Sequence, residues 1–171
     1  MKHLLLMRHA KSSWADAGMD DHDRPLNDRG RRDAPRMAAY LAERGCLPDL
    51  VVASTARRVV ETLEGMAGHQ PSGFAAAAGD VTFRSELYLA TPGTILHIGA
   101  EHAKHDDVET LMLVGHNPGM EQAVARFRGV KDAMPTAAIG ICRLAIDSWD
   151  DLVSAAADEA DVTLVRPKQL H

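Results

Sequence analysis

Residues 4–10 read Leu-Leu-Leu-Met-Arg-His-Ala, and this stretch decides the fold that the sequence predicts. Four apolar residues follow one another and end at a charged residue. An unbroken apolar run of this length is typical of a strand buried on both faces, as in a parallel sheet covered by helices. The same pattern returns at residues 50–53 and at residues 111–114. The three runs therefore predict buried strands of one sheet.

Longer stretches with helical spacing lie between these runs. A helix is expected over about residues 28–44, because one face of it would carry four apolar side chains. These are Ala34, Met37, Ala38 and Leu41. Pro35 within this pattern indicates either a kink or a later start, and Gly45 ends the helix.

Three more helices are expected at residues 56–66, 92–103 and 118–127. The last of them has Asn117 as a natural N-cap and Pro118 in the first helical position. Each helix follows a predicted strand, as in a chain that alternates strand and helix along its length.

Shorter patterns complete the fold prediction. Residues 81–83 predict a short strand, residues 138–146 and 162–165 predict two more, and the Ala- and Gly-rich residues 68–79 predict a loop. The alternation of strands and helices predicts an α/β fold: a three-layer sandwich with a mostly parallel central sheet and helices on both faces. With 171 residues, one domain over residues 1–171 is expected.

Composition excludes several classes of protein. Nineteen Lys and Arg against 24 Asp and Glu give a formal net charge of −5, which argues against general binding of nucleic acid or of an anionic membrane. No stretch has the roughly 18 apolar residues that a membrane span needs, and the first apolar run is too short for a signal peptide. Cys46 and Cys142 predict two buried thiols rather than a disulfide framework. A cytoplasmic location is therefore expected.

Polar residues that carry chemistry gather directly after each of the three apolar runs. In chain order they are Arg8 and His9, then Ser54, Arg57 and Arg58, then His116 and Asn117. In open α/β sheets, ligands bind at the carboxyl ends of the strands, where helix N-termini also attract anions. The three groups are therefore expected at one edge of the sheet.

Arginine and histidine together point to a phosphoryl group. Two guanidinium groups can clamp one tetrahedral phosphate through their planar forks of donors. A histidine whose pKa lies near its free value of about 6.5 offers an unprotonated nitrogen that can attack phosphorus. A second histidine, when protonated, can stabilise charge on the equatorial oxygens.

Each group also has a simpler interpretation. Ser54 alone is a helix N-cap, Asn117-Pro118 alone is a helix start, and one of Arg57 and Arg58 is a solvated helix residue. Coincidence of all three groups at one sheet edge favours a functional site.

At this point the motifs resemble a known family. Residues 6–10 are similar to the Arg-His-Gly signature of the histidine phosphatase (phosphoglycerate mutase-like) superfamily, although Ala10 replaces the usual Gly. Residues 54–62 resemble its Ser-x-x-x-Arg-x-x-x-Thr segment, which aligns Arg58 rather than Arg57 with the clamp arginine. Residues 114–117 resemble its second histidine motif. Further stretches resemble the SixA-type phosphohistidine phosphatase branch: residues 8–14, 23–27, 86–88 and 135–137.

This resemblance implies a role for each residue. His9 would be the nucleophile that forms a transient phosphohistidine, and Arg8, Arg58 and His116 would bind the phosphoryl group. Catalysis in the family needs no metal and no cofactor. The acid motif of the mutases has no clear equivalent, and Glu86 is the best candidate for a general acid, with a solvated loop carboxylate as the alternative.

Loop residues near His9 are further candidates on the same resemblance. Ser12 and Asn117 are expected to contact phosphate, and Lys11 either contacts it or only sets the local electrostatic potential. Arg24 either reaches the pocket or ties its loop to Asp21 or Asp23, and Trp14 packs the loop. The cluster His97, His102 and His105 does not have the spacing of a zinc site and predicts a solvated helix end instead.

The weak acid motif favours one substrate class. An alkoxide leaving group needs a proton from the enzyme, whereas the imidazole of a phosphoramidate can be protonated before cleavage. A phosphatase acting on protein phosphohistidine is therefore expected, with a phosphatase of a small phosphorylated metabolite as the alternative. A non-catalytic phosphate-binding module is disfavoured, because all four site residues are present. The sequence does not specify the oligomeric state.

Overall fold

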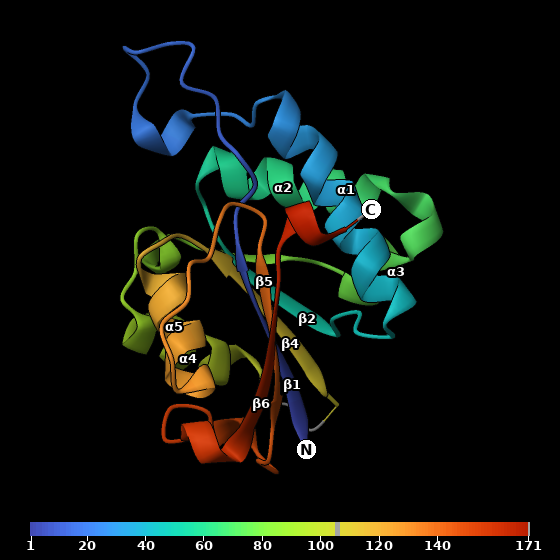
Figure 1. Cartoon of the computed structure of the whole chain (residues 1–171), viewed down its shortest axis with the longest axis vertical. Helices are drawn as coiled ribbons and strands as arrows, with labels where there is room; N and C mark the ends of the chain where they lie inside the picture. Colours follow the sequence, from blue (N-terminus) through green and yellow to red (C-terminus); the bar gives the residue numbers. More distant parts are fainter. Residues whose placement is uncertain (105–106, 171) are drawn as a thin grey trace.

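The computed structural model describes residues 1–104 and 107–170, and a six-stranded sheet lies at its centre (Figure 1). The strands are β1 (Lys2–Arg8), β2 (Leu50–Ser54), β3 (Thr82–Arg84), β4 (Thr110–Gly115), β5 (Ile139–Leu144) and β6 (Ala160–Val165). Their order in the sheet is β3-β2-β4-β1-β5-β6. All the strands that the sequence predicted are therefore present.

The sheet is mixed, with a parallel part that carries the site. Strands β3, β2, β4 and β1 run parallel, whereas β5 pairs antiparallel with β1 and with β6. Every residue of β4 is buried, because the strand lies between two parallel neighbours and beneath helices on both faces. The unbroken apolar run of the sequence reflects this double burial.

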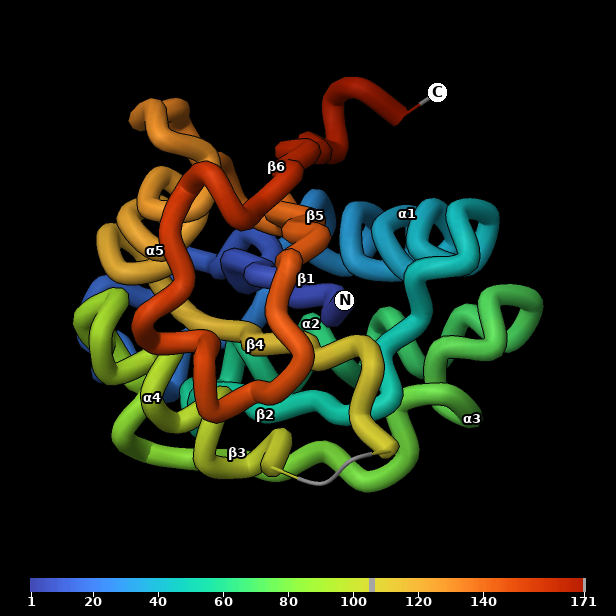
Figure 2. The backbone as a smooth tube through the Cα atoms, turned by 90° about the horizontal axis from the view of Figure 1, so that it is seen from below, coloured from blue at the N-terminus to red at the C-terminus, as the bar shows by residue number. Residues whose placement is uncertain are grey.

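Two helical layers cover the sheet, as Figure 2 shows in a view from below. One layer holds α1 (Asp28–Glu43), α2 (Arg57–Gly68) and α3 (Phe74–Ala78); the other holds α4 (Pro92–His102) and α5 (Gly119–Arg128). Alternate residues of β1 serve different layers: Leu4 and Leu6 belong to one apolar core, and Leu5 and Met7 to the other. The predicted three-layer α/β sandwich is thus confirmed. No helix in the described part of the chain is long and apolar enough to cross a bilayer.

Four local predictions need correction. Helix α1 runs through Pro35 from Asp28 without a later start, although the ring removes one intrahelical hydrogen bond. Helix α5 begins at Gly119, one residue after the expected Pro118. Residues 68–79 are not simply a loop, because the four alanines after Phe74 form α3, between glycines with positive φ at both ends. Cys46 is only half-buried, whereas Cys142 is buried as expected.

The segment between β1 and α1 lies beyond the carboxyl ends of the parallel strands (Figure 1). Its two ends are joined by hydrogen bonds from Ser13 N–H to the Pro25 carbonyl (2.7 Å) and from Asn27 N–H to the Lys11 carbonyl (2.9 Å). The N-terminus of α1 then packs against this closed segment, with Gly30 facing Lys11. The helix therefore supports the segment that follows His9.

Replacement of Gly30 tests this close approach. A Cβ at Gly30 would lie 2.3 Å from the Lys11 carbonyl oxygen, so Gly30→Ala forces backbone to move. We expect it to lower the free energy of unfolding by about 1–3 kcal/mol, measured by urea denaturation. Gly93→Ala in α4 is the matched control, because its Cβ meets nothing within 4 Å. Equal stability of the two variants would contradict the packing described here.

Candidate active site

The carboxyl ends of β1 and β4 bring two histidines together. Arg8 is paired with Gly115 across the parallel strands, and His9 N–H donates to the Gly115 carbonyl at 3.1 Å. His9 and His116 directly follow these paired residues, so their rings leave the sheet side by side. The ring centroids are 5.2 Å apart.

Arg58, in the first turn of α2, lies against both rings. Its Nε donates to His9 Nε2 (3.2 Å) and its Nη2 donates to His116 Nδ1 (3.2 Å). Arg57 instead makes an exposed ion pair with Glu61 on the outer face of the same helix (3.0 Å). The structure therefore places Arg58, and not Arg57, beside the histidines.

A hydroxyl on α2 fixes this helix to the loop after β1. Thr62 Oγ1 accepts the N–H of Ala10 (3.0 Å) and donates to the Arg58 carbonyl (2.6 Å). Ala10 and Thr62 are fully buried, so this link is shielded from water. Arg58 and Thr62 are four residues, or about one helical turn, apart in α2. Thr62 can therefore hydrogen-bond both to the backbone of Arg58 and to the residue after His9.

A cavity of about 290 Å³ lies at this edge of the sheet, beside the two histidines and Arg58. Its lining includes Arg8, His9, Arg58, His116, Ser12 and Asn117. The structure thus brings together all but one of the site residues that the sequence singled out.

The hydrogen bonds of the two rings assign their protons. His9 Nδ1 lies 2.7 Å from the Ala10 carbonyl, which only accepts, so Nδ1 carries the hydrogen and Nε2 holds the lone pair that receives the Arg58 N–H. His116 Nδ1 likewise accepts from Arg58, so its Nε2–H donates to Ser54 Oγ (2.8 Å). Ser54 therefore orients His116 besides accepting the N–H of Ala56.

Burial keeps both imidazoles neutral. Desolvation lowers the pKa of His9 to about 4, and the neighbouring Arg58 and Arg8 act in the same direction. Desolvation, His9 and Arg58 lower the pKa of His116 to about 3. At neutral pH, His9 Nε2 is therefore unprotonated, and the positive charge of the cavity comes from Arg8, Arg58 and Lys11 rather than from His116.

Arg8 faces the cavity beside the histidines. Its Nη1 donates to the Met134 carbonyl (3.1 Å), and burial lowers its pKa. Its Nε is buried and finds no hydrogen-bond partner among the described residues. A buried donor without an acceptor is costly, and an anion in the cavity would satisfy it.

Sequence reasoning missed Asp21 and Tyr88. Asp21 accepts two hydrogen bonds from Arg58, through its carbonyl (2.6 Å) and its carboxylate (2.9 Å). The Tyr88 hydroxyl also donates to this carboxylate, and the Tyr88 ring meets the His116 ring edge-on at 5.2 Å. The Tyr88 and Arg58 hydrogen bonds hold the pKa of Asp21 below its usual range. Tyr88 ends one of the stretches that resemble the SixA-type branch, and Asp21 was considered only as a partner of Arg24. Neither was expected beside Arg58, because two 3₁₀ turns, and not the strands, bring them there.

Glu86 is the one predicted site residue that the structure does not bring to the cavity. It lies in the 3₁₀ helix Ser85–Leu87, where Arg84 holds it in an exposed ion pair (2.9 Å). The Arg84 hydrogen bond is the main cause that lowers its pKa to about 2. Glu86 is therefore ionised and turned to a neighbouring arginine, which corrects its assignment as the best candidate for a general acid.

The loop residues divide into two groups. Lys11, Ser12 and Trp14 line the cavity. Arg24 stacks over the Trp14 ring at 3.9 Å and donates to carbonyls of its own loop, at Asp16 and Met19 rather than at the expected aspartates. Arg24 thus holds the shape of the loop.

Two polar contacts bear on the remaining predictions. The side-chain N–H of Asn117 donates to the Met134 carbonyl (2.9 Å), which also accepts a hydrogen bond from Arg8. The side-chain oxygen of Asn117 accepts the N–H of Glu121 near the start of α5. His102 bonds to Arg84, and His105 lies outside the described residues. Within residues 1–104 and 107–170, no group of three His, Cys, Asp or Glu side chains could hold a metal ion.

Comparison with known families and proteins agrees with this geometry. Residues 4–76 match the model of the histidine phosphatase superfamily (branch 1). An uncharacterized chloroplastic protein of Arabidopsis thaliana is 36% identical over 155 residues, which cover 88% of this chain and 70% of the relative.

Two solved structures have a similar fold. A provisionally named phosphohistidine phosphatase SixA from Nakamurella multipartitia superposes with a TM-score of 0.77 at 28% identity, covering 97% of this chain and 96% of the other. A protein of the same provisional name from Agrobacterium tumefaciens gives a TM-score of 0.68 at 32% identity, covering 82% and 91% of the two chains.

The two depressed pKa values predict how stability depends on pH. Below pH 6.5 the unfolded chain binds protons on His9 and His116 that the folded chain does not bind, so the free energy of unfolding falls as the pH is lowered. We expect a loss of about 2 kcal/mol per histidine between pH 7 and pH 5. Urea denaturation at several pH values measures it.

A double variant isolates this contribution from that of other groups. His9→Asn combined with His116→Asn should flatten the pH dependence, whereas His97→Asn, at an exposed position, should leave it unchanged. The same slope in the double variant and in the natural chain would show that these imidazoles are not held neutral.

Proposed function

The chain belongs to the histidine phosphatase superfamily and is of its SixA type, and from this premise we propose that it hydrolyses protein phosphohistidine through a covalent phosphohistidine on His9. The observation that carries the proposal is the arrangement of His9 Nε2, which is unprotonated and accepts a hydrogen bond from the buried Arg58 at a cavity that Arg8 also lines. Phosphatase activity follows from the family.

The proposed first step transfers the phosphoryl group to the enzyme. The His9 Nε2 lone pair forms the new N–P bond while the P–N bond to the substrate imidazole breaks, and the leaving imidazole departs protonated. Arg8 and Arg58 hold the non-bridging oxygens, on which negative charge lies in the transition state. Arg58 must then exchange its hydrogen bond on His9 Nε2 for one on the phosphoryl group.

The second step returns the enzyme to its starting state. Water attacks phosphorus, the N–P bond to His9 breaks, and inorganic phosphate leaves. The Ala10 carbonyl keeps the Nδ1 hydrogen of His9 throughout, so the same nitrogen is free for the next cycle. His116, held by Ser54, donates no proton in this scheme, since its one N–H is directed at the serine.

The absence of a protonated acid supports a phosphoramidate substrate. Among the described cavity-lining residues Asp21 is the one carboxylic acid, and the hydrogen bonds from Tyr88 and Arg58 keep it ionised. Glu86 lies outside the cavity. A leaving imidazole tolerates this arrangement, because it is basic enough to take its proton from solvent before the bond breaks, whereas an alkoxide does not.

Replacement of the nucleophile tests the mechanism. We expect His9→Ala to lose at least about 10³-fold in turnover of a phosphohistidine peptide and of p-nitrophenyl phosphate, because the proposed intermediate forms on the imidazole that this change removes. A chelator should leave the natural enzyme unaffected. Arg57→Ala is the control, expected within about twofold of the natural enzyme. Undiminished turnover by His9→Ala would remove His9 from the mechanism.

Substrate choice is tested separately. A phosphohistidine peptide should be hydrolysed with a kcat/KM at least about 10²-fold above those of sugar phosphates and nucleotides, since only the latter need an acid from the enzyme. Initial rates of phosphate release on both sets measure the ratio. A ratio in favour of one metabolite would assign the chain to the metabolite phosphatases instead.

A further inference from the structure

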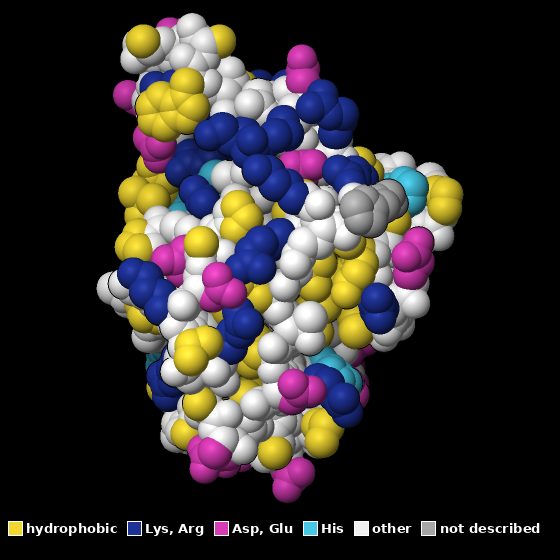
Figure 3. Space-filling model, viewed as in Figure 1, with side chains coloured by type: hydrophobic (Ala, Val, Ile, Leu, Met, Phe, Trp, Pro, Cys, Tyr) yellow, Lys and Arg dark blue, Asp and Glu magenta, His cyan; other side chains and the backbone are white. Residues whose placement is uncertain are grey.

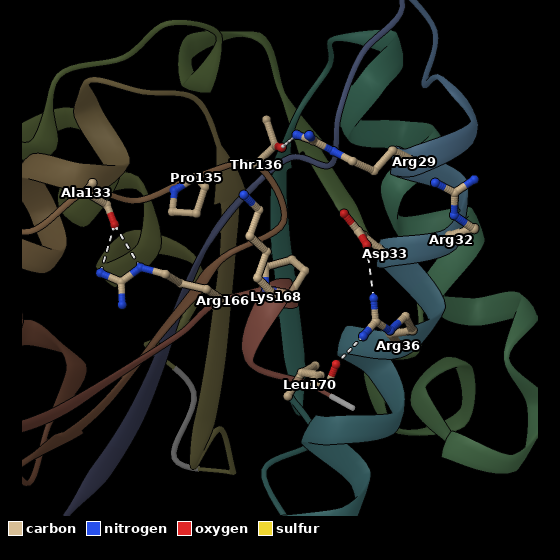
Figure 4. A pocket seen from close by; sticks show the side chains of 11 residues that line it. Arg29, Arg32, Asp33, Arg36, Ala133, Pro135, Thr136, Arg166, Lys168 and Leu170 are labelled. Atoms are coloured by element: carbon tan, nitrogen blue, oxygen red, sulfur yellow. Dashed lines mark hydrogen bonds and ion pairs between the residues drawn. The ribbon is translucent and has the colours of Figure 1, made fainter.

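A second groove, with a volume of about 520 Å³, lies between α1 and the segment that follows β6 (Figure 4). Five cationic side chains line it, with Asp33 as the one acidic residue among the described lining. The cations are Arg29, Arg32, Arg36, Arg166 and Lys168. Nothing in the proposed mechanism uses these residues.

The cations come from two separate elements. Arg29, Arg32 and Arg36 are spaced by three and four residues in α1, which places them on one face of the helix. Arg166 and Lys168 belong to the C-terminal segment, and Figure 4 shows them on the side of the groove opposite the helix. The space-filling view shows Lys and Arg gathering across this face of the molecule (Figure 3). The chain as a whole carries a net charge of −5, so this concentration of positive charge is local.

Intramolecular pairs account for only part of this charge. Arg36 pairs with Asp33 (3.5 Å), and Arg166 pairs with Asp132 (2.8 Å). Arg29, Arg32 and Lys168 make no ion pair with any residue in the described part of the chain; Arg29 donates to the hydroxyl of Thr136 (3.2 Å). Three positive charges thus face one groove without a counter-charge among the described residues.

Apolar surface lies between the cations. Pro135, Pro167 and Leu170 also line the groove. A free inorganic anion would gain nothing from these side chains, whereas an extended polypeptide can place acidic side chains on the cations and its apolar side chains between them.

The groove adjoins the catalytic cavity. Thr136 lines both, and Arg29 holds its hydroxyl. The next residue, Ala137, donates its N–H to the carbonyls of Arg8 and His9 (3.1 and 2.9 Å). One turn of backbone therefore separates the groove from the nucleophile.

We infer that this groove binds an acidic segment of the polypeptide that carries the phosphohistidine. The inference rests on the proposed function and narrows its substrate to phosphoproteins with acidic residues near the modified histidine. Binding there places the phosphohistidine at the cavity without any contact to the leaving imidazole itself.

Two phosphohistidine peptides that differ only in charge test the inference. One carries four Asp or Glu beside the phosphohistidine, and the other carries Asn or Gln at the same positions. We expect the natural enzyme to prefer the acidic peptide by about tenfold in kcat/KM at 50 mM salt. The preference should shrink at 300 mM salt, because exposed charges are screened.

Charge reversals on each wall assign the preference to the groove. Arg32→Glu and Lys168→Glu should each reduce it to about twofold or less, with turnover of p-nitrophenyl phosphate unchanged. Arg31→Glu is the matched control, since it makes the same change at the adjacent, exposed position of α1 outside the groove. It should retain the tenfold preference.

Several results would overturn the inference. They are a natural enzyme without preference, a preference that survives both reversals, or an equal loss on p-nitrophenyl phosphate in the groove variants. Fluorescence anisotropy of an unphosphorylated acidic peptide separates this failure from failure of the proposed function. Binding that Arg32→Glu abolishes supports the groove even if no phosphohistidine peptide is hydrolysed. Binding of pyrophosphate, but not of the peptide, would make the occupant a small polyanion and the inference wrong.

Discussion

The Arg58 guanidinium, donating to one nitrogen of each of two buried imidazoles, is the interaction on which the site depends. A guanidinium offers only hydrogens, so both facing nitrogens must hold lone pairs. Their remaining ring hydrogens are then directed at the Ala10 carbonyl and the Ser54 hydroxyl. One buried cation thus determines which nitrogen of each ring carries the hydrogen and how both rings are oriented. His9 Nε2 is unprotonated at neutral pH because burial disfavours a charged imidazole and because protonation would place a second positive charge next to Arg58.

A buried cation is stable only when its N–H groups have acceptors and its charge has a counter-charge nearby. Arg58 is 4% exposed, and two more of its donors are satisfied by the carbonyl and the carboxylate of Asp21. Removing the partner of a buried charge is strongly destabilising, so the loop that supplies Asp21 belongs to the site as much as the strands do. Arg24 and the N-terminus of α1 hold that loop in turn. The packing of α1 thus stabilises the loop, the loop positions Asp21, and Asp21 holds the Arg58 guanidinium beside His9.

The strands and helices were predictable from the regular spacing of apolar residues in the sequence. The convergence of Arg8, His9, Arg58 and His116 was predictable too. Parallel neighbours must present their carboxyl ends together, which places Arg8, His9 and His116 at one edge whatever the loops do. Asp21 and Tyr88 were not predictable, because their positions depend on loop conformation rather than on strand order. The prediction for Glu86 was wrong for a related reason. Glu86 does follow strand β3 closely, as a residue at the edge of the sheet should, but an ion pair with Arg84 holds its carboxylate outside the cavity.

The cavity has no protonated acid, and a basic groove lies beside it. These two features bear on two separate questions, how the phosphoryl group is transferred and how the substrate is selected. In the proposed mechanism the cavity binds the phosphoryl group, and groups that bind phosphate do not distinguish one phosphorylated molecule from another. Discrimination must then come from contacts remote from phosphorus, where binding free energy can be used for positioning. In this molecule such contacts are available where Thr136 joins the cavity to the cationic face of α1. On the proposed function, specificity and chemistry are therefore separable: the guanidinium between the two imidazoles would serve the reaction, and the arginines of α1 would serve the choice of polypeptide.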